Sequence, residues 1–427
     1  MTASFSLPTS GPPNSGPPRI LIVGLNYAPE EVGIGPYTTG LAEALVARGH
    51  RVEVVAGKPY YPQWKVNPAF AGFSWHRCEE AGVGVTRCPH YVPDKPTGLR
   101  RIIHLSSFAL SALPPVLHRV LRRRSERPEI VICIAPALLS VVTGWLGARL
   151  AGAKLWIHLQ DFEVEAALAT GLLDPTAASA RLARWVEASI LALADRVSTI
   201  SPQMCAKLID KGIATERVLE LRNWSDTRFS ADPAGAAAIR TDWALGSRHV
   251  ALYSGNIARK QGIEILVEAA RLLVRRKDLI FIICGEGPNR AELERLAAGL
   301  ENLQLHDLQP AARMGAMLTM ASVHLLPQIA DAADLVLPSK LTNMLASGRP
   351  VVATAEPGTG LYDEVDGCGA ACPPGDAPAL AAAIEALVDD PARRAVLGEA
   401  ATRRATERWA KDAIIDRFVI ELGKVVR

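Results

Sequence analysis

Short apolar runs alternate with helical patterns along the chain, and this alternation begins twice. The first series of expected strands comprises residues 20–23, 51–55, 130–134, 154–159 and 196–200. The second series follows Asn223-Trp224-Ser225-Asp226 and comprises residues 249–254, 279–284, 323–326 and 351–354. Strands separated by helices pair in parallel, because the helix returns the chain to the starting edge of the sheet. The pattern therefore predicts two Rossmann-like, doubly wound α/β domains with a cleft between them.

Length and composition agree with this division. The 427 residues are 49% hydrophobic, which is enough to form two cores. We expect a disordered tail over residues 1–18, a first domain over 19–224 and a second domain over 225–404, with a helix over 405–427 packing back on the first. The net charge of +3 gives no reason to expect nucleic acid as a partner. Seven Cys without paired metal spacing, and an N-terminus unlike a signal peptide, indicate a reducing cytoplasm.

The segment 334–353 predicts an anion-binding site in the second domain. Ser339 is a suitable N-cap for a helix over Lys340 to Ala346, and Gly348 would end that helix before the strand at 351–354. A helix N-terminus presents free backbone N–H groups and a partial positive charge, which suit a diphosphate. An ordinary turn between helix and strand is the alternative.

Glycine-containing loops follow three of the expected strands, where open α/β sheets bind their ligands. They are Gly33-Ile34-Gly35, Gly255-Asn256 and Gly285-Glu286-Gly287-Pro288. Glycine allows the backbone to approach a ligand closely. Arg259 and Lys260, beside a helix start, suit an anion held between loop and helix. The alternatives are plain tight loops and two solvated charges.

His158 lies near the end of the expected strand 154–159, and Asp161 follows that strand. The imidazole could serve as a polar contact or proton shuttle, and the carboxylate as an acceptor base. A lone histidine at a strand end is more often structural. We expect the neighbouring Glu163 and Glu165 to be solvated.

Together these motifs resemble those of the retaining GT-B glycosyltransferases of family 4, over roughly residues 19–427. The counterparts are Ser254-Gly255-Asn256 with Lys260-Gln261-Gly262, Gly285-Glu286-Gly287-Pro288 and Ala346-Ser347-Gly348-Arg349-Pro350. More specific resemblance, to WcaI-type colanic acid biosynthesis glycosyltransferases, is carried by Asn26-Tyr27-Ala28-Pro29-Glu30 and residues 157–163 and 335–343.

The chain departs from the family pattern in the donor site. Leu335 and Asn343 stand where the family has its Glu-x7-Glu pair, and Asn256 and Gln261 align with the family Arg and Lys. Asp334 could replace the first Glu, because it lies one residue earlier. The resemblance then implies a donor site of Gly33, Gly35, Gly255, Asn256, Arg259, Lys260, Gly285, Gly287, Asp334, Ser339, Lys340, Leu341 and Asn343.

The implied reaction moves a sugar, with GDP-fucose as a candidate donor, from a nucleotide diphosphate to a lipid-linked exopolysaccharide intermediate with retention. No carboxylate cluster suggests a metal, so N–H groups and cations would stabilise the leaving phosphate. No other cofactor is implied. A sugar-nucleotide 2-epimerase of the same fold and a catalytically silent scaffold of polysaccharide assembly are the alternatives.

Residues 100–124 are apolar in the middle and basic at both ends, and Pro114-Pro115 is expected to interrupt them. Basic amphipathic segments settle on anionic membrane surfaces. This predicts peripheral association with the inner face of the membrane. Core-packing helices with a solvated basic end are the alternative.

Overall fold

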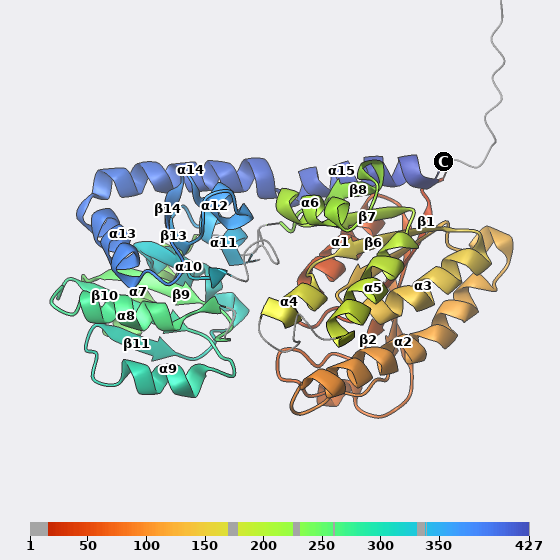
Figure 1. The fold of residues 1–427 in the computed structure, drawn as a ribbon, viewed down its shortest axis with the longest axis horizontal. Helices are drawn as coiled ribbons and strands as arrows, with labels where there is room; N and C mark the ends of the chain where they lie inside the picture. Colours follow the sequence, from red (N-terminus) through yellow and green to blue (C-terminus); the bar gives the residue numbers. More distant parts are fainter. Residues whose placement is uncertain are drawn as a thin grey trace, which may run out of the picture.

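A computed structural model describes residues 16–169, 178–224, 231–258, 261–330, 338 and 340–426. Two α/β domains lie side by side, and the last two helices run along both of them (Figure 1). Of the predicted sites, Arg259, Lys260, Asp334 and Ser339 lie outside the described residues.

The first domain contains an eight-stranded sheet in the order β3-β4-β2-β1-β5-β6-β7-β8. Its strands are β1 (Arg19–Gly24), β2 (Arg51–Gly57), β3 (His76–Glu80), β4 (Val83–Cys88), β5 (Ile130–Ala135), β6 (Lys154–Leu159), β7 (Arg196–Thr199) and β8 (Val218–Glu220). Only the pairing of β3 with β4 is antiparallel among these described strands. Every residue of β5 is buried, as expected for a central strand covered on both faces.

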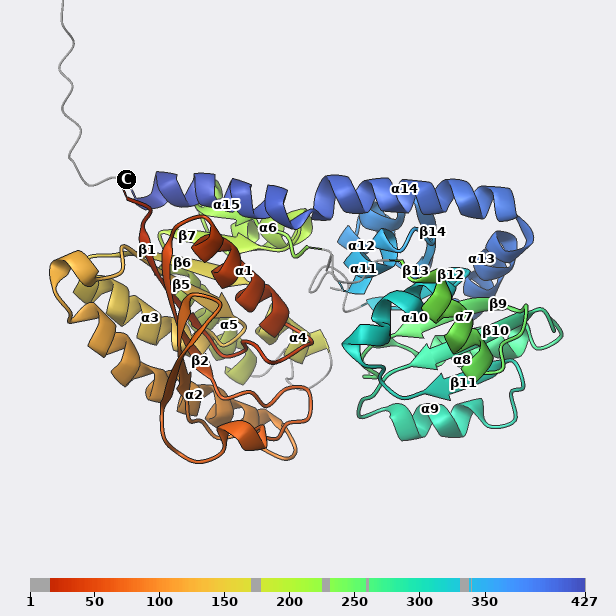
Figure 2. The same ribbon diagram turned by 180° about the vertical axis from the view of Figure 1, so that it is seen from behind.

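Helices cover both faces of this sheet. They are α1 (Gly35–Ala47), α2 (Gly98–Val120), α3 (Leu138–Ala151), α4 (Glu163–Ala169), α5 (Ala178–Ala192) and α6 (Pro202–Asp210), with short 3-10 helices at Pro68–Phe70, Arg124–Glu126 and Thr215–Arg217. Helices α2, α3 and α5 share a core on the near face in Figure 1. Helix α1 packs in a second core on the opposite face, seen in Figure 2.

The second domain contains a six-stranded parallel sheet in the order β11-β10-β9-β12-β13-β14. This is the Rossmann order, whose switch point lies between β9 and β12. The strands are β9 (His249–Ser254), β10 (Leu279–Cys284), β11 (Leu303–His306), β12 (Val323–Leu326), β13 (Val351–Thr354) and β14 (Gly369–Cys372). The helices are α7 (Pro233–Asp242), α8 (Glu264–Leu272), α9 (Arg290–Ala297), α10 (Met314–Met320), α11 (Lys340–Ala346), α12 (Gly360–Val365), α13 (Ala377–Asp389) and α14 (Pro391–Trp409), with a 3-10 helix at Ala311–Arg313.

The chain returns to the first domain at its end. Helix α14 packs on the second domain, and α15 (Lys411–Val426) buries Ile415, Phe418 and Leu422 in the core that contains α1. The rings of Phe418 and Trp156 lie 4.7 Å apart, centroid to centroid. The return therefore begins at Ala410, between the two helices, and not at residue 405.

The prediction of two wound parallel sheets is confirmed. Strands β6, β9, β10, β12 and β13 and helix α11 have the predicted bounds. Each of these strands contains a short apolar run flanked by polar or turn residues, so the local pattern indicates where the strand lies.

The prediction that Pro114-Pro115 interrupts residues 100–124 was wrong, because α2 continues through both prolines. Pro115 has no N–H to donate to the carbonyl of Ser111, four residues earlier. The indole Nε1 of Trp75 donates to that oxygen instead, at 2.9 Å. A side chain from another segment therefore replaces the missing helix hydrogen bond.

The basic end of this segment is less exposed than the sequence suggested. Arg119 is buried, donates to Thr86 Oγ1 at 2.7 Å and pairs with Glu53 at 3.4 Å. Arg122 also pairs with Glu53, at 3.2 Å. Arg123 and Arg124 remain exposed. Among the described residues, no helix is long and apolar enough to cross a membrane.

Candidate active site

The glycine loops after β9 and β10 pack directly against each other. The amide of Gly255 donates to the carbonyl of Cys284 at 2.9 Å, and that of Ile257 donates to the carbonyl of Glu286 at 2.7 Å. A Cβ at Gly285 would overlap the carbonyl oxygen of Gly255, and one at Gly287 would overlap that of Ile257. Glycine is required here for loop packing, whether or not a ligand also approaches.

Lys340, the first residue of α11, lies over the loop that follows β9. Its Nζ donates to the hydroxyl of Tyr253 at 2.7 Å and lies 4.0 Å from the centre of that ring. It would be 3.1 Å from a Cβ placed on Gly255. Burial raises the pKa of Tyr253, so the phenol stays protonated and donates to the carbonyl of Asn256 at 2.7 Å. A cation is thus held at the switch point of the second sheet.

The other two predicted residues of α11 differ in exposure. The side chain of Leu341 is fully buried in the core, so it anchors the helix start and offers no surface to a ligand. Asn343 is half-buried, on the next turn.

In the first domain, Glu30 organises the loop between β1 and α1. Its carboxylate accepts hydrogen bonds from the amides of Tyr60 and Tyr61, at 2.9 and 3.0 Å. A Cβ on Gly35 would lie 3.0 Å from Glu30, and one on Gly33 would lie 3.2 Å from the ring of Tyr61. Burial raises the pKa of Glu30, while the backbone donors act in the opposite direction. Gly33 therefore sits in a tightly packed loop between β1 and α1, and Gly35 begins α1 against the same carboxylate.

His158 is held by hydrogen bonds at both ring nitrogens. Nδ1 lies 2.9 Å from Ser198 Oγ, and the side-chain amide nitrogen of Gln160 lies 2.8 Å from Nε2. An amide nitrogen can only donate, so Nε2 accepts and the proton of the neutral ring is on Nδ1. Burial lowers the pKa of His158 to about 4. At neutral pH this ring is an acceptor fixed by Gln160, which does not suit a proton shuttle.

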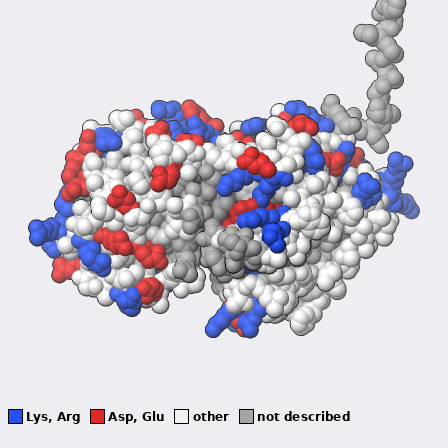
Figure 3. Space-filling view, viewed as in Figure 1, with Lys and Arg blue, Asp and Glu red and all other residues white. Residues whose placement is uncertain are grey.

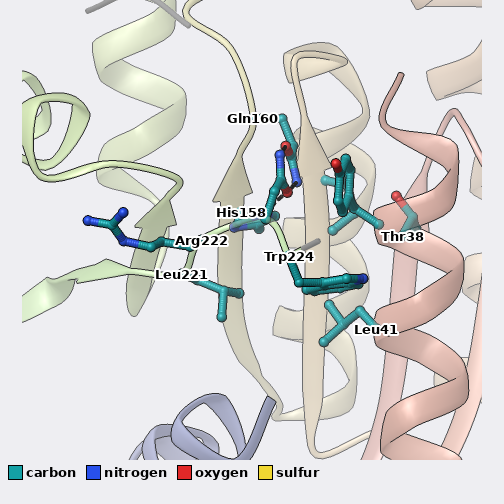
Figure 4. Close-up of a pocket in the computed structure, with 10 residues that line it drawn as sticks. Thr38, Leu41, His158, Gln160, Leu221, Arg222 and Trp224 are labelled. Atoms are coloured by element: carbon teal, nitrogen blue, oxygen red, sulfur yellow. Dashed lines mark hydrogen bonds between the residues drawn. The ribbon is translucent and has the colours of Figure 1, made fainter. Parts of the chain in front are cut away.

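Gln160 connects His158 to the segment that leaves the first domain. It donates to Asn223 Oδ1 at 3.0 Å, and Asn223 returns a hydrogen bond to Gln160 Oε1 at 2.9 Å. These side chains line a small pocket, partly open to solvent, together with Tyr37, Thr38, Leu41, Ile134, Leu221, Arg222 and Trp224. In Figure 4, Gln160 and His158 point toward one another, and Arg222 points away from the other labelled side chains.

Asp161 follows β6 and is partly exposed beside this network. The expectation that Glu163 and Glu165 are solvated was wrong. Glu163 Oε1 pairs with Arg101 Nε at 2.7 Å, and Glu165 is bound by Lys211. Lys211 also binds the buried Glu187 at 2.6 Å. The segment after β6 is thus tied to α2, α5 and the end of α6.

The predicted site residues form two groups on different sheets. Contacts in the second domain bring together Gly255, Asn256, Gly285, Gly287 and Lys340. In the first domain, Gly33 and Gly35 belong to the Glu30 loop, while His158 belongs to the Gln160 network. Within the described part of the chain, no three His, Cys, Asp or Glu side chains are placed to hold a metal ion.

Sequence reasoning missed Tyr253 and Gln160 as members of these groups. Tyr253 lies inside a buried strand, and an apolar pattern does not show that its hydroxyl reaches Lys340. Gln160 follows β6 two residues after His158, and this polar residue at a strand end was the available signal.

Comparison with known proteins agrees with this architecture. Residues 32–224 match the model of the glycosyl transferase 4-like domain, and residues 238–404 match that of the glycosyl transferases group 1. The chain is 40% identical, over 95% of its length and 99% of the relative, to the putative colanic acid biosynthesis glycosyl transferase WcaI of Escherichia coli. It is 25% identical, over 91% of its length and 94% of the relative, to the GDP-mannose-dependent α-(1-6)-phosphatidylinositol monomannoside mannosyltransferase of Mycolicibacterium smegmatis.

A solved structure also resembles the fold. HepE of Anabaena in complex with UDP superimposes with a TM-score of 0.70 at 15% identity, covering 95% of this chain and all of HepE. At 15% identity, this comparison shows that the two folds are alike and no more. The two matched domain models and the full-length similarity to WcaI show that the chain belongs to the family 4 glycosyltransferases, with the GT-B fold.

Proposed function

We propose that this glycosyltransferase moves a sugar from a nucleotide diphosphate donor to a lipid-linked intermediate of an exopolysaccharide, with retention of the anomeric configuration. The relative in Escherichia coli is named for colanic acid biosynthesis, and that in Mycolicibacterium smegmatis for GDP-mannose and a phosphatidylinositol acceptor. Both names support a polysaccharide or lipid-linked acceptor. A GDP-linked sugar is the first donor to test, with GDP-fucose the leading candidate.

The observation that carries the proposal is the cation of Lys340 at the switch point of the second sheet. Breaking a sugar–diphosphate bond develops negative charge on the leaving phosphate. A fixed cation beside that phosphate lowers the free energy of the transition state. Lys340 is held in place by Tyr253, next to Gly255. Arg259 and Lys260 follow Gly255 closely in the sequence, and we assign them to the same phosphate contacts. The reaction would then need neither a metal ion nor another cofactor.

The first domain would receive the acceptor. We assign His158 to positioning, because Gln160 occupies the nitrogen that would accept a proton. The acceptor proton would pass to the donor phosphate, on the face from which the leaving group departs. Peripheral association of residues 100–124 with the inner membrane surface would bring the enzyme to its lipid-linked acceptor.

Transfer by the purified protein is the direct test. We expect sugar from GDP-fucose, or from another sugar nucleotide in a panel, to appear on a lipid-linked acceptor in the presence of EDTA, with the anomeric configuration retained by NMR. Conversion of the sugar nucleotide without acceptor would indicate the epimerase. Nucleotide binding without turnover would indicate the scaffold, and activity that EDTA abolishes and Mg²⁺ restores would contradict metal independence.

The Lys340→Ala variant tests the site itself. Loss of this charge should weaken nucleoside diphosphate binding by about 1–3 kcal/mol, as for other charge-assisted hydrogen bonds, measured by calorimetry. Lys277→Ala is a matched control, because Lys277 is an exposed lysine of the same domain that pairs with Glu301. Equal affinities for parent and Lys340→Ala would remove Lys340 from the donor site.

A further inference from the structure

Strand β3 forms one outer edge of the first sheet, with β4 as its neighbour. Its sequence is His76-Arg77-Cys78-Glu79-Glu80, and the side chains of His76, Arg77 and Glu79 are exposed. A strand at the edge of a sheet presents unpaired N–H and C=O groups, to which a further strand can bond. The outer side of β3 is therefore a place where another chain can extend the sheet.

The turn between β3 and β4 determines which backbone groups point outward. Ala81 and Gly82 form a two-residue turn, with φ of 50° and 78°. Positive φ at both positions is typical of the type I′ turn, whose flanking residues exchange backbone hydrogen bonds. Alternate positions along β3, starting at Glu80, therefore bond to β4. The N–H and C=O groups of Arg77 and Glu79 point away from β4, and no other described segment bonds to them.

A second copy of β3 can pair antiparallel with this edge only if outward residues face outward residues. The pairing is then centred on Arg77, on Cys78 or on Glu79. Centring on Arg77 or on Glu79 places that residue opposite its own copy, and like charges directly opposite are destabilising. Centring on Cys78 places Arg77 opposite the partner's Glu79 and Glu79 opposite the partner's Arg77. Only this register combines opposite charges with both backbone hydrogen bonds in each pair.

We propose that the protein forms a dimer through β3, in an antiparallel pairing centred on Cys78 that continues one sheet through both chains. Charged residues on an edge strand normally prevent pairing. Here a basic residue precedes the centre and an acidic residue follows it, so a two-fold axis matches each charge with its opposite. Arg77 lies 3.4 Å from Glu53, which it would exchange for the partner's Glu79. Glu53 keeps Arg119 and Arg122 as partners.

The surroundings of β3 are compatible with a second copy. Phe73 and Trp75, just before the strand, are 93% and 50% exposed. Continued by two residues, the same register places Trp75 opposite the partner's Ala81, which would cover part of the indole. The net charge is only +3, and on the face drawn in Figure 3 Lys and Arg are interspersed with Asp and Glu. Two copies therefore repel each other weakly at long range.

Sedimentation velocity over a range of protein concentrations tests the dimer directly. A short strand pair gives a small contact, so we expect a reversible dimer whose fraction rises with concentration and falls at high salt. Arg77→Glu and Glu79→Arg should each raise the dissociation constant by about tenfold or more, because both symmetric pairs change from opposite to like charge. Glu126→Arg, at another exposed carboxylate of the first domain, is the matched control and should dimerise as the parent does.

Restoring the charges separates this pairing from a general effect of charge. The double variant Arg77→Glu with Glu79→Arg has the reversed order, so it should dimerise as the parent does. Mixing the two single variants should also give a heterodimer, because one strand is then entirely acidic at these positions and the other entirely basic. Circular dichroism and thermal melting establish that each variant is folded.

Cys78 provides a second readout. In the proposed register it faces its own copy at a position without backbone hydrogen bonds, where Cα atoms lie about 4.5 Å apart and a disulfide can form. Copper phenanthroline would take two electrons from the two thiols, which release two protons, and a covalent dimer should appear on a non-reducing gel. Cys78→Ser should abolish that dimer. Cys205→Ser is the control, because Cys205 is also partly exposed.

Three results would overturn the proposal. They are a parent that stays monomeric at every concentration, a dimer that both single charge variants retain, and a covalent dimer that forms without Cys78. None of these measurements involves a sugar donor or acceptor, so the inference stands or falls independently of the proposed function.

Discussion

At the scale of single residues, burial determines what His158 can contribute. Its side chain is 5% exposed, with partners at both ring nitrogens. The charged imidazolium would lose its hydration, which is why burial lowers the pKa to about 4. Above about pH 5 the ring is neutral, and a neutral ring that accepts from Gln160 can position neighbouring groups but has no proton to give at Nε2.

The same pKa predicts how stability changes with pH. An imidazole in the unfolded chain has a pKa near 6.5, so between about pH 6.5 and pH 4 the unfolded state binds a proton that the folded state does not. The contribution of His158 to the free energy of unfolding is therefore lost as pH falls through this window. The His158→Gln variant lacks this effect. As pH falls through the window, the free energy of unfolding of the parent, relative to that of the variant, should therefore decrease by up to about 1.4 kcal/mol per pH unit. Urea denaturation near pH 5 and near pH 8 measures this, and an equal advantage at both would contradict a buried neutral ring.

At the scale of elements, α2 shows how a helix can contain two consecutive prolines. The lost N–H of Pro115 leaves the carbonyl of Ser111 without its helix partner, and Trp75 supplies a donor from the segment that leads into β3. The helix and this segment therefore stabilise each other through one hydrogen bond. The arrangement also places a half-exposed tryptophan against α2.

A double-mutant cycle tests this exchange of donors. Trp75→Phe should cost about 1 kcal/mol of stability, because the carbonyl of Ser111 loses its donor. In a Pro115→Ala background the new alanine N–H can bond to that carbonyl, so the same tryptophan change should cost less. Chemical denaturation of the four proteins gives the coupling, with Trp185→Phe as a control at another exposed tryptophan. Equal costs in both backgrounds would show that the indole acts by packing alone.

At the scale of the whole molecule, a buried ionic cluster joins the two domains. Glu364 of α12 accepts from Arg222, in the segment after β8, at 2.5 Å and from Arg408 of α14 at 3.1 Å. The guanidinium of Arg222 also lies 5.0 Å from the ring centre of Trp409. The cluster lies beside the segment in which the chain leaves the first domain and beside the end of α14, after which the chain returns to it. It therefore connects the two crossings of the chain between the domains.

Removing the central carboxylate should loosen this coupling. Glu364→Gln removes a carboxylate whose side chain is only 4% exposed, while Arg222 keeps Glu220 as a partner at 2.5 Å. Arg408 is 43% exposed and can be hydrated, so we expect a loss of about 2 kcal/mol, as for hydrogen bonds to charged groups. Differential scanning calorimetry should show a lower or divided unfolding transition. Glu385→Gln, which removes an exposed partner of Arg276, should change stability by less than about 1 kcal/mol. A variant that melts as one transition at the parent temperature would show that other contacts set the domain arrangement.

The sequence by itself determined the elements that depend on neighbouring residues. Apolar runs predicted the central strands of both sheets but not the outer strands β3, β4, β8, β11 and β14. A cap, a helical stretch and a glycine predicted α11 at its observed bounds. The glycine loops were also recognisable, because only glycine fits where two backbones meet. Resemblance in short motifs then indicated the family, which the comparisons confirmed.

Only the tertiary structure decided the roles of the charged and polar side chains. Arg222 and Glu364 are 142 positions apart, and Arg119 meets Glu53 through a contact between a helix and a distant strand. Glu163, which we expected to be solvated, pairs with Arg101 instead, and burial leaves His158 a neutral acceptor. A local pattern fixes which face of an element is apolar, whereas the partner of a buried charge depends on how distant elements pack, and only the folded chain brings those elements together.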